Sequence, residues 1–226
     1  MYKLKKFLPA PLFLLIKSYL SNRFFTVRLN NTYSIRYTIR AGVPQGSDIA
    51  TFLNSIFTHD IPKTFYTSLG TYADDTLITA SHESHVTASE MIQNHLNMIS
   101  LWANRWKIKI NETKSVQVTF SLRNLDSPPV TLNNITIPKA NEVKYLGLTL
   151  DKRLTWSPHI KLKRKTVNSR LHILRPLLKS KLSLSNKLTI YKSIIRPAWT
   201  YGIQLWALQS PLTPTRFKLF NLSAYD

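Results

Sequence analysis

Asp74 and Asp75 are the residues of this sequence whose types and spacing most directly suggest chemistry. They lie between two β-prone runs, 69–72 and 76–79, and this pattern predicts the tip of a tight hairpin. Adjacent residues on a straight strand point to opposite faces of a sheet, so both acids can serve one site only where the backbone turns. Their repulsion would be relieved by a cation, and oxygen ligands without nearby cysteine favour Mg²⁺ or Mn²⁺. The alternative is a solvated Asp-Asp turn, which is common in proteins of any kind.

The charge of the chain is unevenly distributed around this pair. Lys and Arg number 31 against 11 Asp and Glu, a formal net charge of +20, which indicates a polyanionic partner: nucleic acid or an acidic membrane surface. Residues 1–47 and 152–225 contain basic but no acidic side chains, whereas 48–151 contain both. This division is expected if the central acids hold a metal while the flanks hold phosphates. Chance clustering of a few carboxylates is the alternative.

The elements that must position the two acids follow from periodicity and turn residues. The chain has 226 residues, of which 43% are hydrophobic, and a packed α+β core is expected. Asn30-Asn31 and Asn133-Asn134 are the predicted turns of two further hairpins. Ser47 or Asp48, and Ser157 with Pro158, are the predicted helix starts, and Pro176 and Pro197 the predicted helix breaks. Helices are predicted near 11–21, 48–62, 85–106 and 157–207, and strands at 24–30, 33–40, 115–120, 130–137 and 143–150.

The first residues and the absence of cysteine bear on location. A basic start followed by residues 7–16 is similar to a signal peptide, but Pro9, Pro11 and Lys17 interrupt or close the apolar stretch. Ten residues cannot span a bilayer, so a short packed helix is the favoured interpretation and no membrane partner is expected. The absence of cysteine excludes disulfides, thiolate metal sites and a Cys nucleophile, and fits an intracellular location.

Four stretches in order give the sequence a family resemblance. Tyr72-Ala73-Asp74-Asp75 between hydrophobic runs resembles the catalytic hairpin of reverse transcriptases, specifically those of jockey-like non-long-terminal-repeat retrotransposons. The other three stretches are Ala41 to Ser47 with Phe52-Leu53-Asn54, Leu101 to Lys114, and Val143 to Asp151 with Leu154-Thr155-Trp156. Tyr201-Gly202 through Trp206 is similar to the family's thumb. Each motif alone is weak, whereas the four in family order are specific and cover nearly the whole chain.

The resemblance implies a set of site residues and ligands. Asp74, with Asp75 beside it, would bind Mg²⁺ or Mn²⁺ in two-metal nucleotidyl transfer. Lys114 would assist the leaving phosphate, although Lys109 competes for that role. Tyr72 would pack by the primer end. The implied template and nucleotide contacts are Gly42, Pro44, Gln45 and Gly46, the primer grip is Tyr145, Leu146 and Gly147, and the phosphate contacts are Lys161, Lys163, Arg164, Lys165 and Arg170. The implied partners are an RNA template, a DNA primer and deoxynucleoside triphosphates, in the nucleus or a cytoplasmic ribonucleoprotein.

The resemblance also predicts the domain organisation. Residues 1–155 would form a partial polymerase palm, an antiparallel sheet with packed helices, and 156–226 an all-α thumb truncated at its C-terminus. The family supplies a further catalytic Asp on an upstream strand, preceded by the fingers, whereas this sequence has no acid before Asp48. The residues after Ser47 also depart from the family pattern. We therefore expect a reverse transcriptase fragment that is inactive alone; the alternative is a non-catalytic, basic remnant that binds RNA or DNA duplex.

Overall fold

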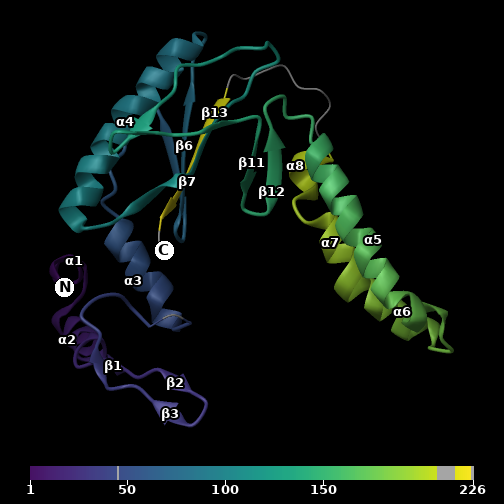
Figure 1. Ribbon diagram of the computed structural model, residues 1–226, viewed down its shortest axis with the longest axis horizontal. Helices are drawn as coiled ribbons and strands as arrows, with labels where there is room; N and C mark the ends of the chain where they lie inside the picture. The colour runs from purple at the N-terminus through teal and green to yellow at the C-terminus, as the bar shows by residue number, and fades with distance from the viewer. Residues whose placement is uncertain (45, 208–216, 225–226) are drawn as a thin grey trace. The chain divides into compact units, whose positions relative to one another are not determined.

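The computed structural model describes residues 1–44, 46–207 and 217–224. The chain divides into two compact units, Met1–Pro62 and Lys63–Asp226, and Figure 1 shows their elements. The predicted boundary between residues 155 and 156 lies inside the second unit, where the last two-stranded hairpin gives way to helices. The mixture of helices with small, mostly antiparallel sheets confirms the α+β class.

The first unit packs three helices and two short strand pairs. A small core of Leu4, Ile16 and Leu53 joins its helices, and the buried Lys3 pairs with Asp60. The helices are α1 (Tyr2–Phe7), α2 (Ala10–Leu20) and α3 (Asp48–Thr58), and the strands are β1 (Phe24–Phe25), β2 (Arg28–Leu29), β3 (Thr32–Tyr33) and β4 (Tyr37–Thr38). The predicted hairpin around Asn30-Asn31 is confirmed, because β2 pairs with β3 and β1 with β4.

A five-stranded sheet forms the centre of the second unit. Its order is β10-β7-β13-β6-β5, so the strand nearest the end of the chain lies between two strands that come much earlier. Helix α4 (His85–Trp106) lies along the sheet in Figure 1, and its buried positions follow a helical period, with Ile92, Leu96 and Ile99 almost fully enclosed. The strands are β5 (Ser68–Tyr72), β6 (Asp75–Ser81), β7 (Ile110–Thr119), β10 (Lys139–Ala140) and β13 (Phe217–Ala224).

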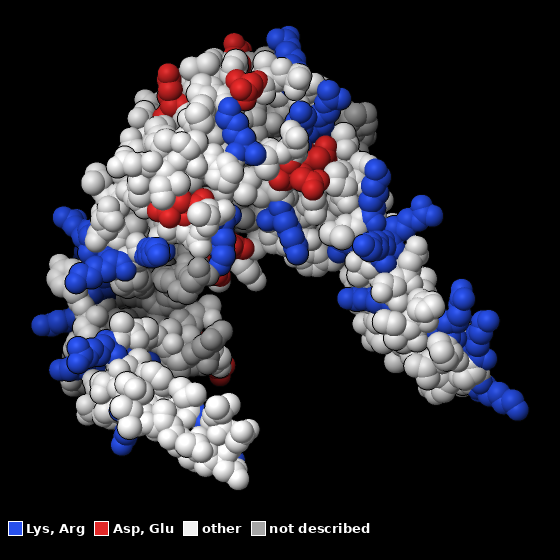
Figure 2. Space-filling view, viewed as in Figure 1, with Lys and Arg blue, Asp and Glu red and all other residues white. Residues whose placement is uncertain are grey.

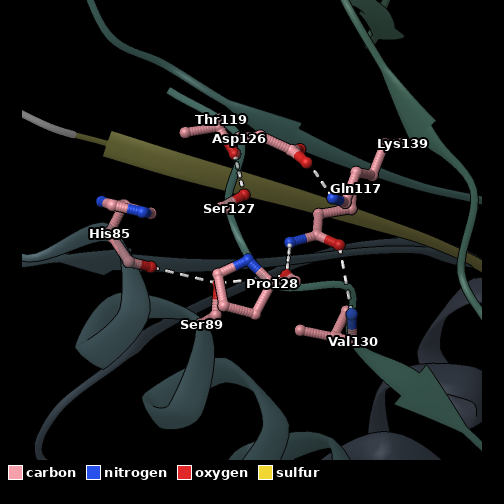
Figure 3. A network of polar contacts seen from close by, with 9 residues as sticks. All are labelled: His85, Ser89, Gln117, Thr119, Asp126, Ser127, Pro128, Val130 and Lys139. Carbon is pink, nitrogen blue, oxygen red and sulfur yellow. Dashed lines mark hydrogen bonds and ion pairs between the residues drawn. The ribbon is translucent and has the colours of Figure 1, made fainter. Parts of the chain in front are cut away.

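Buried polar side chains fix the loop that follows β7. Gln117, only 1% exposed, donates from Nε2 to the Pro128 carbonyl at 3.0 Å, and its Oε1 accepts from the Val130 backbone N–H at 3.2 Å. Ser89 of α4 donates to the same Pro128 carbonyl at 3.3 Å, as Figure 3 shows. One glutamine side chain thus makes hydrogen bonds to two backbone groups of the loop, and the Pro128 carbonyl accepts a second one from Ser89.

Two small hairpins follow this loop. In the first, β8 (Thr131–Leu132) pairs with β9 (Ile135–Thr136) around Asn133 and Asn134, both with positive φ, as predicted. In the second, β11 (Glu142–Tyr145) pairs with β12 (Leu148–Asp151). Val143 of this second hairpin packs in a core cluster with Val118 and Phe120, which attaches the hairpin to the segment of β7.

The helical part begins directly after β12. Its elements are α5 (Ser157–Lys179), α6 (Leu184–Ile190), a π-helix at Tyr191–Ile195, α7 (Arg196–Thr200) and α8 (Ile203–Trp206), and they form the arm on the right of Figure 1. Both Asp151 carboxylate oxygens accept backbone N–H groups, from Thr155 at 3.1 Å and Trp156 at 2.9 Å. This acid therefore fixes the turn that leads from the hairpin into α5.

Three local predictions were wrong. The predicted start of α3 after Ser47 is confirmed and Ser47 is at its N-cap position, but the predicted side-chain cap is absent, because the Ser47 hydroxyl accepts instead from Tyr19 at 2.8 Å. The N-cap of α5 is Trp156, so Ser157 is its first helical residue. The predicted break at Pro176 is also wrong, because α5 continues past it to Lys179. Among the described helices, none is long and apolar enough to cross a membrane.

Candidate functional site

The two adjacent acids lie at a hairpin tip, as the sequence predicts. Strand β5 pairs with β6 in a register that matches Tyr72 with Asp75, which leaves Ala73 and Asp74 as a two-residue turn. Ala73 has φ +51°, a left-handed conformation that is disfavoured for a residue with a side chain and costs about 1 kcal/mol or more. This strained turn exposes Asp74 and leaves Asp75 half-buried at the start of β6.

The environment of Asp75 disfavours its charge. Burial, and then the neighbouring Asp74 carboxylate, raise the pKa of Asp75 above its usual range. In the part of the chain that the structure describes, no group of three or more His, Cys, Asp or Glu side chains lies together as a metal site. The pair thus offers two hard oxygen donors whose repulsion a divalent cation would relieve, and this donor set fits Mg²⁺ or Mn²⁺.

The β11–β12 hairpin lies beside the acidic hairpin. The Tyr145 hydroxyl oxygen is 3.8 Å from the position that a Cβ would take at Gly70 of β5, so the tyrosine ring end lies against that strand. Burial, and then the Asp75 charge, raise the pKa of Tyr145. The structure therefore brings Tyr72, Asp74, Asp75 and Tyr145 into one neighbourhood, from hairpins 70 residues apart in sequence.

The turn that follows Tyr145 is also strained. Leu146 and Gly147 form its two residues, with φ +45° and +76°, and Tyr145 pairs with Leu148 across it. Glycine accepts such a conformation readily, whereas a leucine there costs roughly 1–3 kcal/mol and persists only where other contacts hold it. The three residues predicted as the primer grip are thus the last residue of one strand and the whole of this turn.

Lys114 lies at the same end of the sheet as the acids. Asp75 pairs with Ser223 of β13, and Ser223 pairs in turn with Asn111 of β7, so Asn111 is two strand spacings, or about 10 Å, from Asp75. The register between β13 and β7 then shifts, and Lys114 falls in that irregular stretch. Its backbone N–H donates to the Asn111 side chain at 3.0 Å.

The predicted template-contacting turn belongs to the first unit. Gly42 and Gly46 both adopt positive φ, +84° and +80°, and apart from their chain neighbours no described residue has an atom within 4 Å of a Cβ built at either. These glycines are therefore required by the backbone conformation and not by a lack of space. Pro44 is half-buried, and Gln45 lies outside the described residues.

The five predicted phosphate contacts divide into two groups on α5. Lys161, Arg164 and Lys165 are exposed. Lys163 is half-buried, with Nζ 4.9 Å from the Tyr201 ring centroid, and Arg170 donates to the Ile194 carbonyl at 2.8 Å. Helical spacing places the exposed Arg175 and Lys179 on the side of Lys161 and Lys165, and Figure 2 shows Lys and Arg gathered along one side of this arm.

Two residues near the site were given no contact of their own in the sequence-based prediction. His159 is fully buried; its Nδ1 accepts from the Thr149 N–H at 3.2 Å, and its Nε2 has no hydrogen-bond partner among the residues that the structure describes. Tyr201, which the sequence offers only as part of a thumb-like motif, donates to the Leu146 carbonyl at 2.6 Å. Neither contact has a local sequence signal, because the partners are 10 and 55 residues apart.

Comparison with known proteins identifies the family of this chain. Residues 1–150 match the family model described as reverse transcriptase (RNA-dependent DNA polymerase). The chain is 42% identical to a probable RNA-directed DNA polymerase from transposon X-element of Drosophila melanogaster over 213 aligned residues. The aligned segment is 91% of this chain and 24% of that protein. The RNA-directed DNA polymerase from mobile element jockey of the same species is 37% identical over 218 residues, or 92% of this chain and 24% of that protein.

The extent of these matches sets what they establish. The chain spans about a quarter of the length of these curated relatives. No solved structure shows a significant match to it. The family match nevertheless covers well over half of the chain and includes the Tyr72–Asp75 hairpin, and the similarity to jockey confirms the resemblance found in the sequence. The chain belongs to the reverse transcriptase (RNA-dependent DNA polymerase) family.

Proposed function

We propose that this chain is the palm and thumb portion of an RNA-directed DNA polymerase of a jockey-like retrotransposon. In this proposal residues 1–155 act as a partial palm with the primer grip, and the helices from Ser157 to Trp206 as the thumb. The expectation that 156–226 is all-α was wrong, because β13 (Phe217–Ala224) lies in the five-stranded sheet between β6 and β7. The observation that carries it is the pairing of Tyr72 with Asp75, which puts two adjacent carboxylates at a hairpin tip beside Tyr145.

Asp74 and Asp75 would hold Mg²⁺ or Mn²⁺. Such an ion stabilises charge on the oxygens of an in-line phosphoryl displacement. The raised pKa of Asp75 supports this role, because a site built for a cation is electrostatically unfavourable without one. Tyr72, a residue that is 65% exposed next to the acids, would contact the primer end, and Lys114 would contact the leaving phosphate. Gly42, Pro44, Gln45 and Gly46 would lie along the template and the incoming deoxynucleoside triphosphate.

The exposed side of α5 would contact the phosphates of an RNA template paired with a DNA primer. Lys161, Lys165, Arg175 and Lys179 share that side and are spread over 18 residues, or about 27 Å of helix. This length matches several successive phosphates of a duplex, which such a row of cations binds without reading sequence. Lys163 and Arg170 would act mainly within the protein, since both already contact groups of the helical part. This role would place the chain inside the cell, in the nucleus or in a cytoplasmic ribonucleoprotein.

Primer extension on an RNA template with Mg²⁺ tests the proposal, together with Mn²⁺ binding followed by electron paramagnetic resonance. We expect Asp74→Ala to weaken Mn²⁺ binding at least tenfold and to leave duplex binding nearly unchanged, and we expect no primer extension by the 226-residue chain alone. Glu142→Ala, which removes an exposed acid from β11, is the control and should bind Mn²⁺ as the unaltered chain does.

Each result has a different meaning. Robust incorporation by the isolated chain would contradict the expected inactivity, although not the site. Unaltered Mn²⁺ binding by Asp74→Ala would contradict the site itself. Duplex binding by an unaltered chain that binds no Mn²⁺ would favour the second candidate function, a non-catalytic duplex-binding module, which the basic face of α5 supports independently of the acids.

A further inference from the structure

Tyr201 joins the helical part of the second unit to the β11–β12 hairpin. Its hydroxyl donates to the backbone carbonyl of Leu146 at 2.6 Å, a contact between residues 55 apart. Leu146 has the left-handed φ of +45° that leucine adopts only under constraint. The hydrogen bond is therefore made to the residue of the turn that most requires an external contact to keep its conformation.

The steric fit between the two segments is equally specific. A Cβ at Gly147 would lie 3.1 Å from Cε1 of Tyr201, and a Cβ at Gly202 would lie 2.6 Å from Cδ2 of Leu148. Both glycines also have positive φ, +76° and +70°. Each segment thus contributes one glycine at the point where the other segment approaches, so a side chain at either position would force its neighbour to move.

Tyr201 is itself held from the helical side. The Trp206 indole donates to its backbone carbonyl at 3.1 Å, and the Lys163 ammonium lies over its ring at 4.9 Å. Trp206 in turn packs edge-to-face against Trp199, with ring centroids 5.5 Å apart. The tyrosine therefore extends from a packed cluster, and its hydroxyl reaches the turn from a fixed base.

We propose that Tyr201 is the positioning residue of the turn Leu146–Gly147, and that it sets where this turn meets the 3′ end of a primer. The turn directly follows Tyr145, which lies beside Asp75, so a displaced turn changes the position of the primer end relative to the acids. Tyr201 touches no reacting group and acts only through the turn. The part of this inference that concerns the primer rests on the function proposed above, whereas the part that concerns the turn does not.

Two measurements on the 226-residue chain test the inference. Tyr201→Phe keeps the ring and the Lys163 contact but removes the hydroxyl, and Tyr191→Phe, an exposed tyrosine on the π-helix, is the matched control. Amide hydrogen exchange is followed at residues 146–148 and, for reference, at residues 131–136. Affinity is measured for a duplex with a recessed 3′ primer end and for a blunt duplex of equal length.

We expect Tyr201→Phe to speed exchange at residues 146–148 by roughly three- to tenfold, the loss of one hydrogen bond, without change at 131–136. We also expect it to remove any preference for the recessed end and to leave affinity for the blunt duplex unchanged. Tyr191→Phe should match the unaltered chain in both measurements. Together these results would support the inference.

Two outcomes overturn it. Unchanged exchange at residues 146–148 would show that Tyr201 does not hold the turn, whatever the chain binds. Faster exchange with an unaltered preference for the recessed end would show that Tyr201 holds the turn but does not position the primer. Failure of the proposed function looks different: the unaltered chain would then bind neither duplex, while the exchange data would still decide the role of Tyr201 in the turn.

Discussion

At the scale of single residues, Asp75 has the clearest electrostatic consequence. Its pKa is raised by burial and by Asp74, so the folded chain binds a proton at Asp75 more readily than the unfolded chain does. Stability contributed by this group is therefore greatest at low pH and falls as pH rises through its pKa. At neutral pH without metal, the acidic pair destabilises the hairpin that presents it, as is common where binding groups are held in place before the ligand arrives.

We expect Asp75→Asn to raise the thermal midpoint slightly at pH 7 in EDTA, because the amide removes the repulsion with Asp74. The gain is about 0.5 kcal/mol or less, since Asp75 is only partly buried and solvent screens the interaction. The difference should shrink as pH falls and vanish where Asp75 is protonated in both the folded and the unfolded chain, and Mg²⁺ should stabilise only the unaltered chain. Calorimetry from pH 3 to pH 8 checks this expectation.

Asp126→Asn provides the contrast for that experiment. The hydrogen bond and charge of Lys139 lower the pKa of Asp126, so its loss should destabilise the folded chain at pH 7. An equal response of the two variants would show that the effect at Asp75 is not local repulsion.

At the scale of elements, α5 has two sides with different roles. Its inner side contains the buried His159 and Leu174, with Lys163 and Arg170 engaged by other parts of the protein. Its outer side presents cations to solvent, which Figure 2 shows along the arm. A helix with this division packs against the protein through one side and leaves the other side free to bind a polyanion. The basic residues of the sequence therefore form one charged surface only because the helix packs in this orientation.

Double substitution Arg175→Gln/Lys179→Gln should reduce the salt dependence of duplex binding. For B-form DNA, each phosphate contact contributes about −0.9 to the slope of log K against log salt, so removing two should flatten the slope by up to about 2. Arg123→Gln, an exposed cation on the loop after β7, should leave the slope unchanged. Fluorescence anisotropy from 50 to 300 mM salt measures this slope. Equal slopes for the two variants would contradict the proposal that the outer side of α5 binds the duplex.

We expect acid to weaken the attachment of α5 to β12, because the buried His159 of α5 accepts a hydrogen bond from Thr149 of that strand. Burial, and then Lys163, lower the pKa of His159, so the unfolded chain binds the proton more readily below pH 6.5. The stability that the neutral imidazole contributes is therefore present above that pH and is lost as pH falls toward the folded-state pKa. We expect His159→Gln to lower stability at pH 7 and to flatten its decline between pH 7 and pH 5.

The exposed His172 on the same helix gives the control. His172→Gln should retain the pH dependence of the unaltered chain in urea unfolding. A decline of the same steepness in His159→Gln would assign the acid sensitivity to other groups.

At the scale of the whole molecule, the sheet of the second unit depends on β13. This strand runs antiparallel to both neighbours and pairs with β6 from Phe217 to Ser223. Removing it would leave β6, which begins with Asp75, and β7 with unpaired edges at the centre of the sheet. The acidic hairpin is thus supported by a strand more than 140 residues later in the chain, which makes the sheet a long-range structure.

Leu219→Pro should disrupt this centre. Proline removes a backbone N–H and is poorly tolerated in a central strand, at a cost of about 3 kcal/mol or more. Leu219→Ala retains the backbone N–H and isolates whatever the side chain contributes. We expect the proline variant to lose cooperative unfolding of the second unit in urea and the alanine variant to keep it. Similar behaviour of both variants would contradict a central position for this strand.

The sequence by itself determined the local features of this protein. The β-prone runs around Asp74 and Asp75 predict their hairpin, the period of residues 85–106 predicts α4 to the residue, and Asn133-Asn134 predicts a turn, since all three depend on neighbours a few positions apart. The four ordered motifs likewise identified the family. The family roles of the site residues remain predictions.

The tertiary structure alone decided what depends on distant partners. Which α5 cations face solvent, the contact of Tyr201 with Leu146, and the place of β13 between β6 and β7 are set by packing between segments 24 to more than 140 residues apart. The side-chain cap proposed at Ser47 failed for the same reason, because Tyr19, 28 residues earlier, engages its hydroxyl. The cap proposed at Ser157 failed for a local reason, because the Asp151 carboxylate fixes the chain just before it. Local propensity has no access to distant partners, and tertiary contacts override it where the two disagree.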